Sequence, residues 1–268
     1  MRLGFEAVHD YGTHRIHVNH VDTQNHSLHK ALLTWYRHNA RDLPWRTTND
    51  PYAILVSEVM LQQTQVARVI PKYHQFLQRF PSFSALAKSP RSEVIRVWAP
   101  LGYNVRAVYL HELAQQVVHI YNGQLPRELA ELRRLRGLGR YTAAAIASLA
   151  YGEDVAVVDT NVRRILTRLF TRNASLHEKE IWKLAQTIVP SGQTASWNQA
   201  LMDLGATVCL KSRPDCNLCP LQSYCKTAHL LEGNGDNLAG STTKSVGKRQ
   251  PRFQGSNRYY RGRIVDLL

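Results

Sequence analysis

LRRLRGLGRYTA, residues 132–143, is the stretch that decides the fold of this chain. Apolar residues at helical spacing run into Gly-Leu-Gly and then directly into an alanine-rich stretch, which predicts two helices joined by a tight turn. Gly137 and Gly139 both permit positive φ and leave the backbone N–H groups of the turn uncovered. Because the second helix begins there with its positive dipole end exposed, we predict a phosphate-binding site, with a plain helix–helix turn as the alternative.

The charge of the chain favours the phosphate site over the plain turn. Three arginines surround the glycines, namely Arg134, Arg136 and Arg140. The 268 residues carry a formal net charge of +14 and a pI of about 9.9, and the hydrophobic content of 44% is that of a folded protein. A folded and strongly basic protein is attracted to polyanions, most often nucleic acid. An anionic membrane surface is a weaker alternative, and no apolar run is long enough to cross a membrane.

Outward from the turn, most of the chain has the apolar spacing of α-helices. Such periods are broken by Pro, Gly or Asn turns and cover residues 52–63, 66–79, 92–99, 105–121, 128–135, 141–150, 160–170, 178–189 and 196–209. A helix capped by Ser27 is expected to precede them. Residues 155–158 are β-rich, but no alternating series of strands exists, so the sequence predicts an all-α fold.

Both ends of the chain differ in composition from the helical part. Residues 1–27 are polar and aperiodic, and they contain His9, His14, His17, His20 and His26. A disordered extension is expected there, with a metal-binding histidine tract as the alternative. After Cys225 the chain is rich in Gly, Asn, Ser and Thr, and residues 244–263 contain seven basic side chains and no acidic one. Residues 229–268 are therefore expected to form a flexible, phosphate-seeking tail, with a short helix over 258–268.

The only four cysteines lie within seventeen residues, in the pattern C-x6-C-x2-C-x5-C. They are Cys209, Cys216, Cys219 and Cys225. Four thiolates so close together, in a loop turned by two prolines, are typical of one metal centre, either zinc or a [4Fe–4S] cluster. Disulfides are the alternative, but the N-terminus has no apolar segment of signal-peptide length. Reduced cytoplasmic thiols on a metal are therefore expected.

Three motifs, in this order along the chain, resemble one known family. The turn at 132–143, the segment VVDTNVRR at 157–164 and the cysteine quartet are similar to the helix-hairpin-helix motif, the catalytic aspartate and the [4Fe–4S] loop of the endonuclease III and MutY superfamily of DNA glycosylases. The resemblance extends from about residue 28 to residue 228. It implies a two-lobed all-α fold, a [4Fe–4S] cluster rather than zinc, and double-stranded DNA with one nucleotide flipped into a pocket between the lobes.

The same resemblance predicts where the two lobes begin and end in the sequence. A helical lobe over 50–150 is expected to carry the hairpin, and a cluster lobe over 151–228 the aspartate and the cysteines. The first helix, within 28–49, is expected to pack with the cluster lobe. The expected state is a monomer in the cytoplasm, associated with the nucleoid in a prokaryote.

Residues 57–64, SEVMLQQT, resemble the signature of the MutY branch, in which the glutamate protonates adenine and the second glutamine enters the duplex. The resemblance assigns these roles to Glu58 and Gln63. Apolar neighbours on both sides of Glu58 favour its protonated form, which a general acid requires. From the residues alone, the alternative is an ordinary solvated stripe on a helix.

Asp159 is the second carboxylate, and it follows an apolar run just before a predicted helix. Cleavage of an N-glycosidic bond needs a proton for the departing base and a negative group near the cation that develops on the sugar. The second role falls to Asp159, which the helix dipole would keep ionised, and the resemblance assigns the positioning of water to Asn161. A helix N-cap and a helix-start hydrogen bond are the respective alternatives.

Tyr141 indicates which reaction the resemblance implies. Bifunctional endonuclease III-type enzymes have a lysine at this hairpin position, which attacks the sugar and leads to strand cleavage by β-elimination. Tyrosine cannot form that Schiff base. The chain is therefore expected to remove the base and leave the strand intact.

Further DNA contacts are expected from the same resemblance. They are Arg46, Tyr103, the hairpin residues Gly137, Gly139, Arg140 and Thr142, and Lys211 and Arg213 of the cysteine loop. Tyr103 would face the duplex as a wedge, with a core aromatic as the alternative. For Lys211 and Arg213 the alternative is a solvated charged loop.

The implied activity is that of a mismatch-directed adenine DNA glycosylase, acting opposite 8-oxoguanine or guanine. Thr160 stands where the MutY branch usually has glycine, and Asn104 where it usually has tyrosine, so a thymine or uracil glycosylase acting at G mismatches stays open. A non-catalytic DNA-binding cluster protein is a further alternative. The residues after Cys225 are expected to be too few and too polar to build the NUDIX-like domain with which MutY enzymes read 8-oxoguanine.

Overall fold

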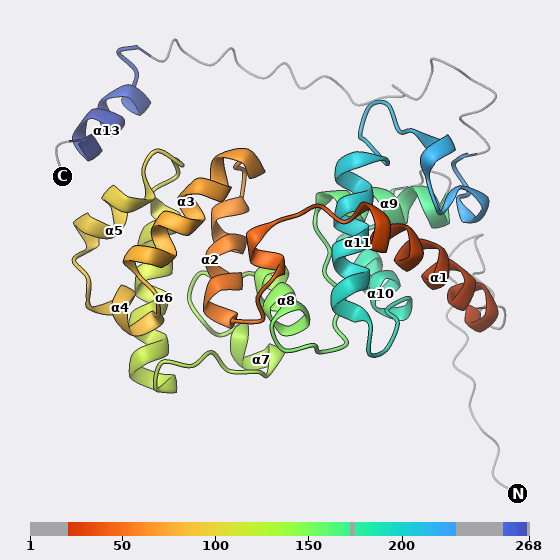
Figure 1. Cartoon of the computed structure of the whole chain (residues 1–268), viewed down its shortest axis with the longest axis horizontal. Coiled ribbons are helices and arrows are strands. Elements are labelled where there is room, and N and C mark those ends of the chain that lie inside the picture. The colour runs from red at the N-terminus through yellow and green to blue at the C-terminus, as the bar shows by residue number, and fades with distance from the viewer. Residues whose placement is uncertain (1–20, 172–174, 229–253, 267–268) are drawn as a thin grey trace, which may run out of the picture.

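The computed structural model of the chain describes residues 21–171, 175–228 and 254–266. Within these residues every regular element is an α-helix or a 3-10 helix, so the predicted all-α fold is confirmed. None of these helices combines the length and the apolar character that a membrane-spanning segment needs. In Figure 1, two groups of helices lie side by side, with α13 (Asn257–Asp266) at one corner beside α5 (Arg91–Trp98).

The two groups interleave along the chain. The first consists of η2 (Pro44–Arg46), α2 (Pro51–Leu61), α3 (Val66–Arg79), α4 (Phe83–Lys88), α5 (Arg91–Trp98), α6 (Val105–Tyr121), α7 (Leu129–Leu132) and α8 (Arg140–Leu149). The second consists of α1 (Val21–Asn39), α9 (Thr160–Thr171), α10 (Glu178–Thr187), α11 (Thr194–Thr207), η3 (Cys216–Leu218) and η4 (Gln222–Tyr224). Because α1 packs against α11, the described part of the chain begins in the second lobe, crosses to the first and returns (Figure 1).

Eight of the nine predicted helical periods correspond to helices with ends close to the expected ones. The exception is 128–135, where the helix stops at Leu132 because residues 133–139 form the turn of the hairpin. The helix α4 was not predicted. It is only six residues long, and Ser82 caps it by accepting a hydrogen bond from the Ala85 N–H at 3.2 Å.

The predicted start of the first helix is wrong. α1 begins at Val21, so Ser27 lies inside the helix, and residues 21–27 are helical rather than part of a disordered extension. Leu28 and Leu32 are both buried, and this packing stabilises the helix without a cap at Ser27. Residues 1–20, with four of the five histidines, and 229–253 lie outside the described residues. The helix predicted over 258–268 is confirmed as α13.

Each lobe has its own hydrophobic core. Phe76 and Trp98 are fully buried in the first. α3 contributes to this core because Val69, Tyr73 and Phe76 recur at helical spacing on one of its faces. The second core lies among α1, α8, α9, α10 and α11, around the fully buried Trp197.

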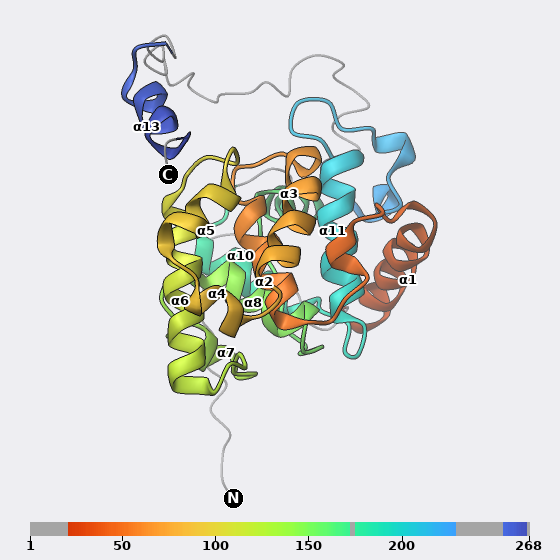
Figure 2. The same ribbon diagram turned by 60° about the vertical axis from the view of Figure 1, so that its left-hand side comes forward.

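The helix α8 lies between the two cores. Ala143 and Ile146 pack into the first core, and Ala144 and Ala145 pack into the second. Because these alanines are small, neighbouring helices approach α8 closely from both sides. In both views α8 lies in the middle of the molecule beside α2 (Figures 1 and 2). The turn at its N-terminus is thereby placed where the lobes meet.

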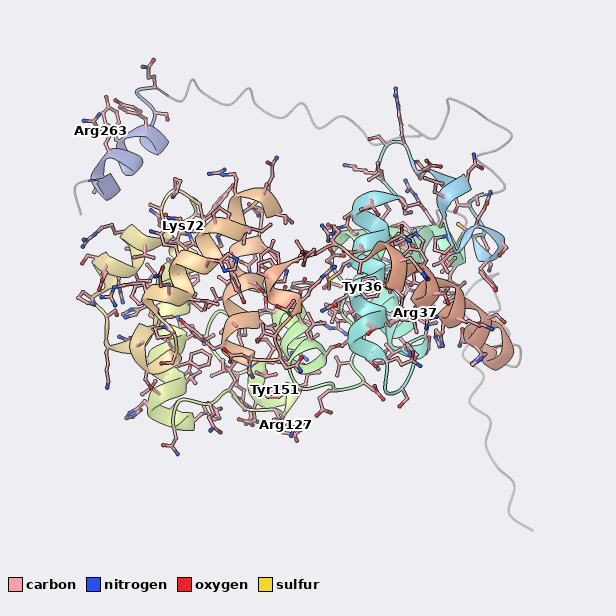
Figure 3. All side chains as sticks on the ribbon, in the orientation of Figure 1. Tyr36, Arg37, Lys72, Arg127, Tyr151 and Arg263 are labelled. Carbon is pink, nitrogen blue, oxygen red and sulfur yellow. The ribbon has the colours of Figure 1, made fainter. Side chains whose placement is uncertain are left out.

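A buried carboxylate ties the segment that crosses between the lobes to α11. The side chain of Asp203 is fully buried and accepts hydrogen bonds at 2.6 Å from Arg41 Nε and from both terminal nitrogens of Arg46. Close by, the hydroxyl of Tyr36 on α1 donates to Gln199 of α11 at 2.7 Å (Figure 3). These bonds fix the path of the chain at the edge of the interlobe region.

Asp203→Asn is expected to lower the free energy of unfolding by about 3 kcal/mol, because it removes the counter-charge of two partly buried guanidinium groups. Urea denaturation followed by circular dichroism measures this change. Asp42→Asn, at an exposed aspartate in the same crossing segment, is the matched control and is expected to stay within about 0.5 kcal/mol of the wild type. Equal stability of the two variants would contradict the role given to Asp203.

Candidate active site

A cavity of about 850 Å³ lies between the two lobes. Its walls come from the crossing segment, α2, the starts of α8 and α9, and α10 and α11. All four predicted catalytic residues line it, namely Glu58, Tyr141, Asp159 and Asn161. Five of the predicted DNA-binding residues line it as well, namely Arg46, Gln63, Gly139, Arg140 and Thr142. Segments far apart in the sequence therefore converge on one cavity.

Glu58 lies on α2, a helix whose residues 52–60 are all buried. Pro51 occupies the first helical position, and Asp50 caps the helix by accepting a hydrogen bond from the Tyr52 N–H at 3.0 Å. Glu58 is only 5% exposed at the cavity wall. The alternative of a solvated stripe on this helix is therefore wrong.

The surroundings of Glu58 favour its acid form. Burial raises the pKa of Glu58 to about 7, and the charge of Asp159 acts in the same direction. A hydrogen bond with Tyr141 and the charge of Arg46 act in the opposite direction, but they do not outweigh burial. A large fraction of Glu58 is protonated at neutral pH, as its apolar sequence neighbours predicted.

Tyr141 contacts Glu58 from the neighbouring helix α8. It is the second residue of α8, and its hydroxyl forms a hydrogen bond with the Glu58 carboxyl group. Burial, followed by the charges of Glu58 and Asp159, raises the pKa of Tyr141 well above its ordinary value. Tyr141 therefore keeps its proton and donates it in a hydrogen bond when Glu58 is ionised.

Asp159 lies just before α9 and is tied to its first turn. One carboxylate oxygen accepts a hydrogen bond from the Val162 N–H at 2.7 Å, and the other accepts one from the Asn161 side chain at 3.2 Å. Asp159 therefore caps the N-terminus of α9, as the alternative predicted. It also lines the cavity. Burial raises the pKa of Asp159, against the opposing effect of these hydrogen bonds and of Arg164.

Arg164 fixes the orientation of Asn161 and was missed from the sequence. Its Nη2 donates to Asn161 Oδ1 at 2.9 Å and to the carbonyl of Gly205 at 2.7 Å, and its Nε donates to the carbonyl of Cys209 at 2.9 Å. A continuous set of hydrogen bonds thus joins the cysteine loop to Asp159. The only signal in the sequence was the helical spacing of Arg164 from Asn161.

The two glycines of the hairpin differ in conformation. Gly137 has a φ of +86°, as predicted, and an added Cβ would lie 3.3 Å from the Cβ of Tyr109. Gly139 has a φ of −73°, so the expectation that it uses positive φ is wrong. An added Cβ at Gly139 would meet nothing within 4 Å. Internal packing therefore gives no reason for a glycine there, whereas close approach of a ligand to the backbone does.

Of the three arginines around this turn, only Arg140 lines the cavity. It is exposed, and its guanidinium lies 4.1 Å from the ring centroid of Trp182. Arg134 forms an ion pair with Glu131, and Arg136 lies 3.4 Å from a carboxylate oxygen of Glu112. Arg140 and the backbone of the turn are therefore the part of the predicted phosphate site that lies at the cavity.

Gln63 and Tyr103 are exposed side chains on strained turns. Their φ angles are +55° and +49°, in the left-handed region that L-residues rarely adopt. Tyr103 is 64% exposed, so the alternative of a core aromatic is wrong. Gln63 lines the cavity, whereas Tyr103 lies outside its walls.

Of the remaining predicted DNA contacts, some line the cavity and others lie outside it. Arg46 lines the cavity, but its terminal nitrogens are bound by Asp203 and by the Arg41 carbonyl. Thr142 is buried in the cavity wall. Lys211 and Arg213 are exposed on the cysteine loop and do not line the cavity.

The four cysteines are of intermediate burial and none of them forms a disulfide, in contrast to the disulfide alternative. Burial raises the pKa of the Cys219 thiol to about 12, and the other three cysteines act in the same direction, so the four sulfurs face a common region. Mutual repulsion of thiolates there is relieved by a cationic centre, so this donor set fits a metal cluster. In the part of the chain that the structure describes, no group of three or more His, Cys, Asp or Glu is arranged to hold a single metal ion.

Residues 56–191 match the HhH-GPD superfamily of base excision DNA repair proteins. The chain is 41% identical over 203 residues to the adenine DNA glycosylase of Buchnera aphidicola, 41% over 240 residues to that of Mycolicibacterium smegmatis, and 42% over 228 residues to that of Homo sapiens. These alignments cover 75%, 88% and 80% of this chain. The chain spans 58%, 78% and 42% of the respective relatives, which is less than two thirds of the Buchnera and human proteins.

Two solved structures are similar over most of the chain. A thermostable thymine-DNA glycosylase has a TM-score of 0.74 at 34% identity and is matched over 78% of this chain and 99% of its own. An endonuclease III in a non-covalent DNA complex has a TM-score of 0.66 at 23% identity, over 78% and 99% of the two chains, which is a likeness of fold alone. With its interlobe cavity, its hairpin and its cysteine loop, the chain belongs to the HhH-GPD superfamily of base excision DNA repair proteins, in the MutY-type branch that contains the adenine DNA glycosylases.

Proposed function

We propose that this chain is a monofunctional DNA glycosylase that hydrolyses the N-glycosidic bond of a flipped adenine mispaired with 8-oxoguanine or guanine. The observation that carries this proposal is the pairing of two unlike carboxyl groups in one cavity. Glu58 is buried, with its pKa raised to about 7, while Asp159 receives two hydrogen bonds at the start of a helix. Two carboxyl groups in different environments divide the roles of acid and charge stabiliser. The adenine DNA glycosylase relatives support adenine as the base.

In the proposed reaction, Glu58 gives its proton to a ring nitrogen of the adenine while the bond to the sugar breaks and its electron pair leaves with the base. The carboxylate of Asp159 stabilises the positive charge that develops on the sugar. Water, oriented by Asn161, then adds to the sugar carbon through its oxygen, gives one of its two protons to a carboxylate of the site and keeps the other in the new hydroxyl group. The products are free adenine and an abasic site in an unbroken strand.

The absence of strand cleavage follows from the residues of the cavity. A lyase step needs an amine that forms a Schiff base with the sugar. Among the described residues, the lining of this cavity contains arginines but no lysine, and Tyr141 occupies the hairpin position at which bifunctional relatives carry lysine. We therefore expect strand breaks only after treatment with alkali.

The proposal includes double-stranded DNA as the partner, a monomeric state and the cytoplasm as the location. It also includes a [4Fe–4S] cluster, held by the four cysteines, which would order the loop that carries Lys211 and Arg213 toward the DNA backbone. Arg168 supports this arrangement, since it lies 3.4 Å from Cys209 Sγ and donates to the carbonyls of Leu210 and Lys211.

A second candidate function is excision of thymine or uracil from G mismatches. It is favoured by Thr160 and by the likeness to a thymine-DNA glycosylase at 34% identity. The two candidates share the acid and the charge stabiliser and differ in the base that fits the cavity.

The two candidates are separated by incubating the purified protein with duplexes that contain A:8-oxoguanine, A:G, T:G or U:G pairs. Each product is analysed with and without alkali. We expect alkali-dependent nicking at adenine. Nicking only at T:G or U:G would favour the second candidate, and nicking without alkali would contradict the monofunctional assignment.

The rate of excision is expected to fall as the pH rises above 7. Burial raises the pKa of Glu58 to about 7, so the acid form is present below that pH and is lost above it. At the acidic end the rate should fall again, because protonation removes the charge of Asp159, whose pKa is also raised by burial. Single-turnover rates between about pH 4 and 9 measure this bell-shaped profile. A rate that is constant from neutral to alkaline pH would contradict a general acid at Glu58.

Gly205→Ala is expected to slow excision by about 100-fold, the effect of misplacing a positioning group by about 1 Å. The new Cβ would lie 2.5 Å from the Cβ of Asn161, so the start of α9 has to shift relative to α11. Single-turnover kinetics measures the effect. Gly262→Ala, where an added Cβ meets nothing within 4 Å, is the matched control. A wild-type rate for Gly205→Ala would show that the position of Asn161 has no effect on the reaction.

A further inference from the structure

Arg106 binds the end of α2, although it lies at the start of α6. It is the second residue of α6 and is 8% exposed. Its Nη1 donates to the carbonyls of Val59 and Met60, at 2.9 and 3.1 Å, and to the carbonyl of Gln62. The last carbonyls of a helix have no partner within that helix, and they form the negative end of its dipole. Arg106 therefore caps α2 from another part of the fold.

The same guanidinium also binds two loops. Nη2 donates to Thr64 Oγ1 at 3.1 Å, in the loop after α2, and to the carbonyl of Gly102 at 3.2 Å, in the loop before α6. Trp98 Nε1 donates to the same Gly102 carbonyl at 3.1 Å. The guanidinium carbon lies 5.3 Å from the Trp98 ring centroid and 5.6 Å from that of Tyr103. One planar group thus connects both loops and the aromatic side chain that follows Gly102.

The two loops carry the exposed side chains of Gln63 and Tyr103. In the described part of the chain, these are two of the three non-glycine residues with positive φ, and the third, Asn122, is a helix C-cap, where asparagine is common. Gln63 is the third residue of a turn that the Thr64 N–H closes on the Leu61 carbonyl, but glutamine and tyrosine, unlike asparagine, do not favour positive φ. Strained backbone persists only when the surrounding structure over-determines it, and Arg106 binds the backbone of both loops.

We propose that Arg106 is a positioning residue that fixes Gln63 and Tyr103 relative to one another, so that both enter the DNA duplex together and displace the target nucleotide. The inference rests on the proposed function only for the identity of the displaced base. Arginine is required because the two terminal nitrogens of its planar fork reach both loops at once. Lysine keeps the charge, but its three donors are on a single nitrogen and cannot reach both sets of carbonyls.

A first test needs no DNA. Hydrogen exchange followed by mass spectrometry compares the wild type with Arg106→Lys. Loss of about two hydrogen bonds is expected to speed amide exchange by at least about tenfold in both 61–64 and 101–104, where the Thr64 and Leu101 amides are hydrogen-bonded in the wild type. Arg96→Lys, at an exposed arginine on α5, is the matched control and should change neither segment. A change in only one segment, in neither, or equally across both lobes would overturn the proposal.

A second test uses DNA and separates extrusion from chemistry. Excision is compared on an adenine paired with 8-oxoguanine and on an unpaired adenine in a bubble, which costs less to extrude. Arg106→Lys is expected to lose about 30-fold in the single-turnover rate on the paired adenine and less than about threefold on the unpaired one. Equal losses on both substrates would overturn the proposal.

The fluorescence of 2-aminopurine at the target position reports extrusion without excision. We expect a rise when the wild type binds the duplex, and a much smaller rise with Arg106→Lys at the same bound fraction. A wild type that extrudes the base but excises no adenine would refute the proposed function and leave the role of Arg106 intact. Equal fluorescence with the two proteins, or no rise with the wild type, would refute the role of Arg106.

Discussion

Glu58→Gln is expected to reduce excision of adenine by about 10³-fold, within the range that general acid catalysis contributes. Glutamine has nearly the shape of the protonated glutamate and can keep a hydrogen bond to Tyr141, but it cannot give a proton to the departing base. Single-turnover kinetics on an A:8-oxoguanine duplex measures the loss. Affinity for the duplex, measured by gel shift, should stay within about threefold, because the side chain is only 5% exposed and makes little contact outside the cavity.

The stability of this variant provides an internal control. The pKa of Glu58 is about 7 in the folded protein and about 4.3 in an unfolded chain, so the folded state binds more protons between these values. Stability of the wild type therefore falls as the pH rises through this window. Glutamine does not ionise, so Glu58→Gln should have a higher Tm than the wild type at pH 8.

Glu128→Gln, at an exposed glutamate, is the matched control and should leave both the excision rate and the Tm unchanged. Unchanged excision by Glu58→Gln would remove the general acid from the mechanism. Absence of excision by the wild type on every duplex, together with tight DNA binding, would favour a non-catalytic DNA-binding cluster protein.

Asp159→Asn is expected to reduce excision by about 10² to 10³-fold, the effect of removing one preorganised group that stabilises charge in the transition state. The variant separates the two roles of Asp159. An asparagine oxygen can still accept the hydrogen bond that the Val162 N–H donates at 2.7 Å, so the start of α9 should stay in place. The negative charge beside the sugar is lost, and with it the stabilisation of the developing cation.

Circular dichroism and the Tm of Asp159→Asn check that α9 remains folded, and the excision rate is measured as for Glu58. The variant should also lose the acidic limb of the pH profile, because the group that titrates there is absent. Asp42→Asn, on the exposed surface, should keep the wild-type rate. A variant that loses its fold together with its activity, and that regains neither on stabilisation by bound DNA, would show that Asp159 is only a helix cap.

The sequence alone determined the fold class and predicted which residues form the candidate active site. The apolar spacing of the helices, the Gly-Leu-Gly turn and the cysteine pattern are local features, because each depends on residues a few positions apart. Such features can be recognised without knowledge of the rest of the chain. The resemblance carried by these motifs then named Glu58, Tyr141, Asp159 and Asn161, and all four line one cavity.

Local patterns failed where a distant neighbour decides the outcome. Ser27 has the side chain of a helix cap, yet packing of α1 against α11 places it inside the helix. Arg136 stands beside the predicted phosphate site, and the structure places it 3.4 Å from a carboxylate oxygen of Glu112 on α6. The roles of Arg164 and Arg106 were missed because most of their partners lie about 40 residues or more away in the sequence.

Only the tertiary structure decided how the carboxyl groups ionise. Glu58 and Asp159 are both acidic side chains in apolar sequence surroundings, but the pKa of each depends on how much water the other lobe excludes and on which donors reach it. Tyr141, on another helix, donates to Glu58, and the first turn of α9 donates to Asp159. Burial is a property of the packed chain. The sequence therefore determined which groups are present, and the packing of the two lobes determined which of them holds a proton at neutral pH.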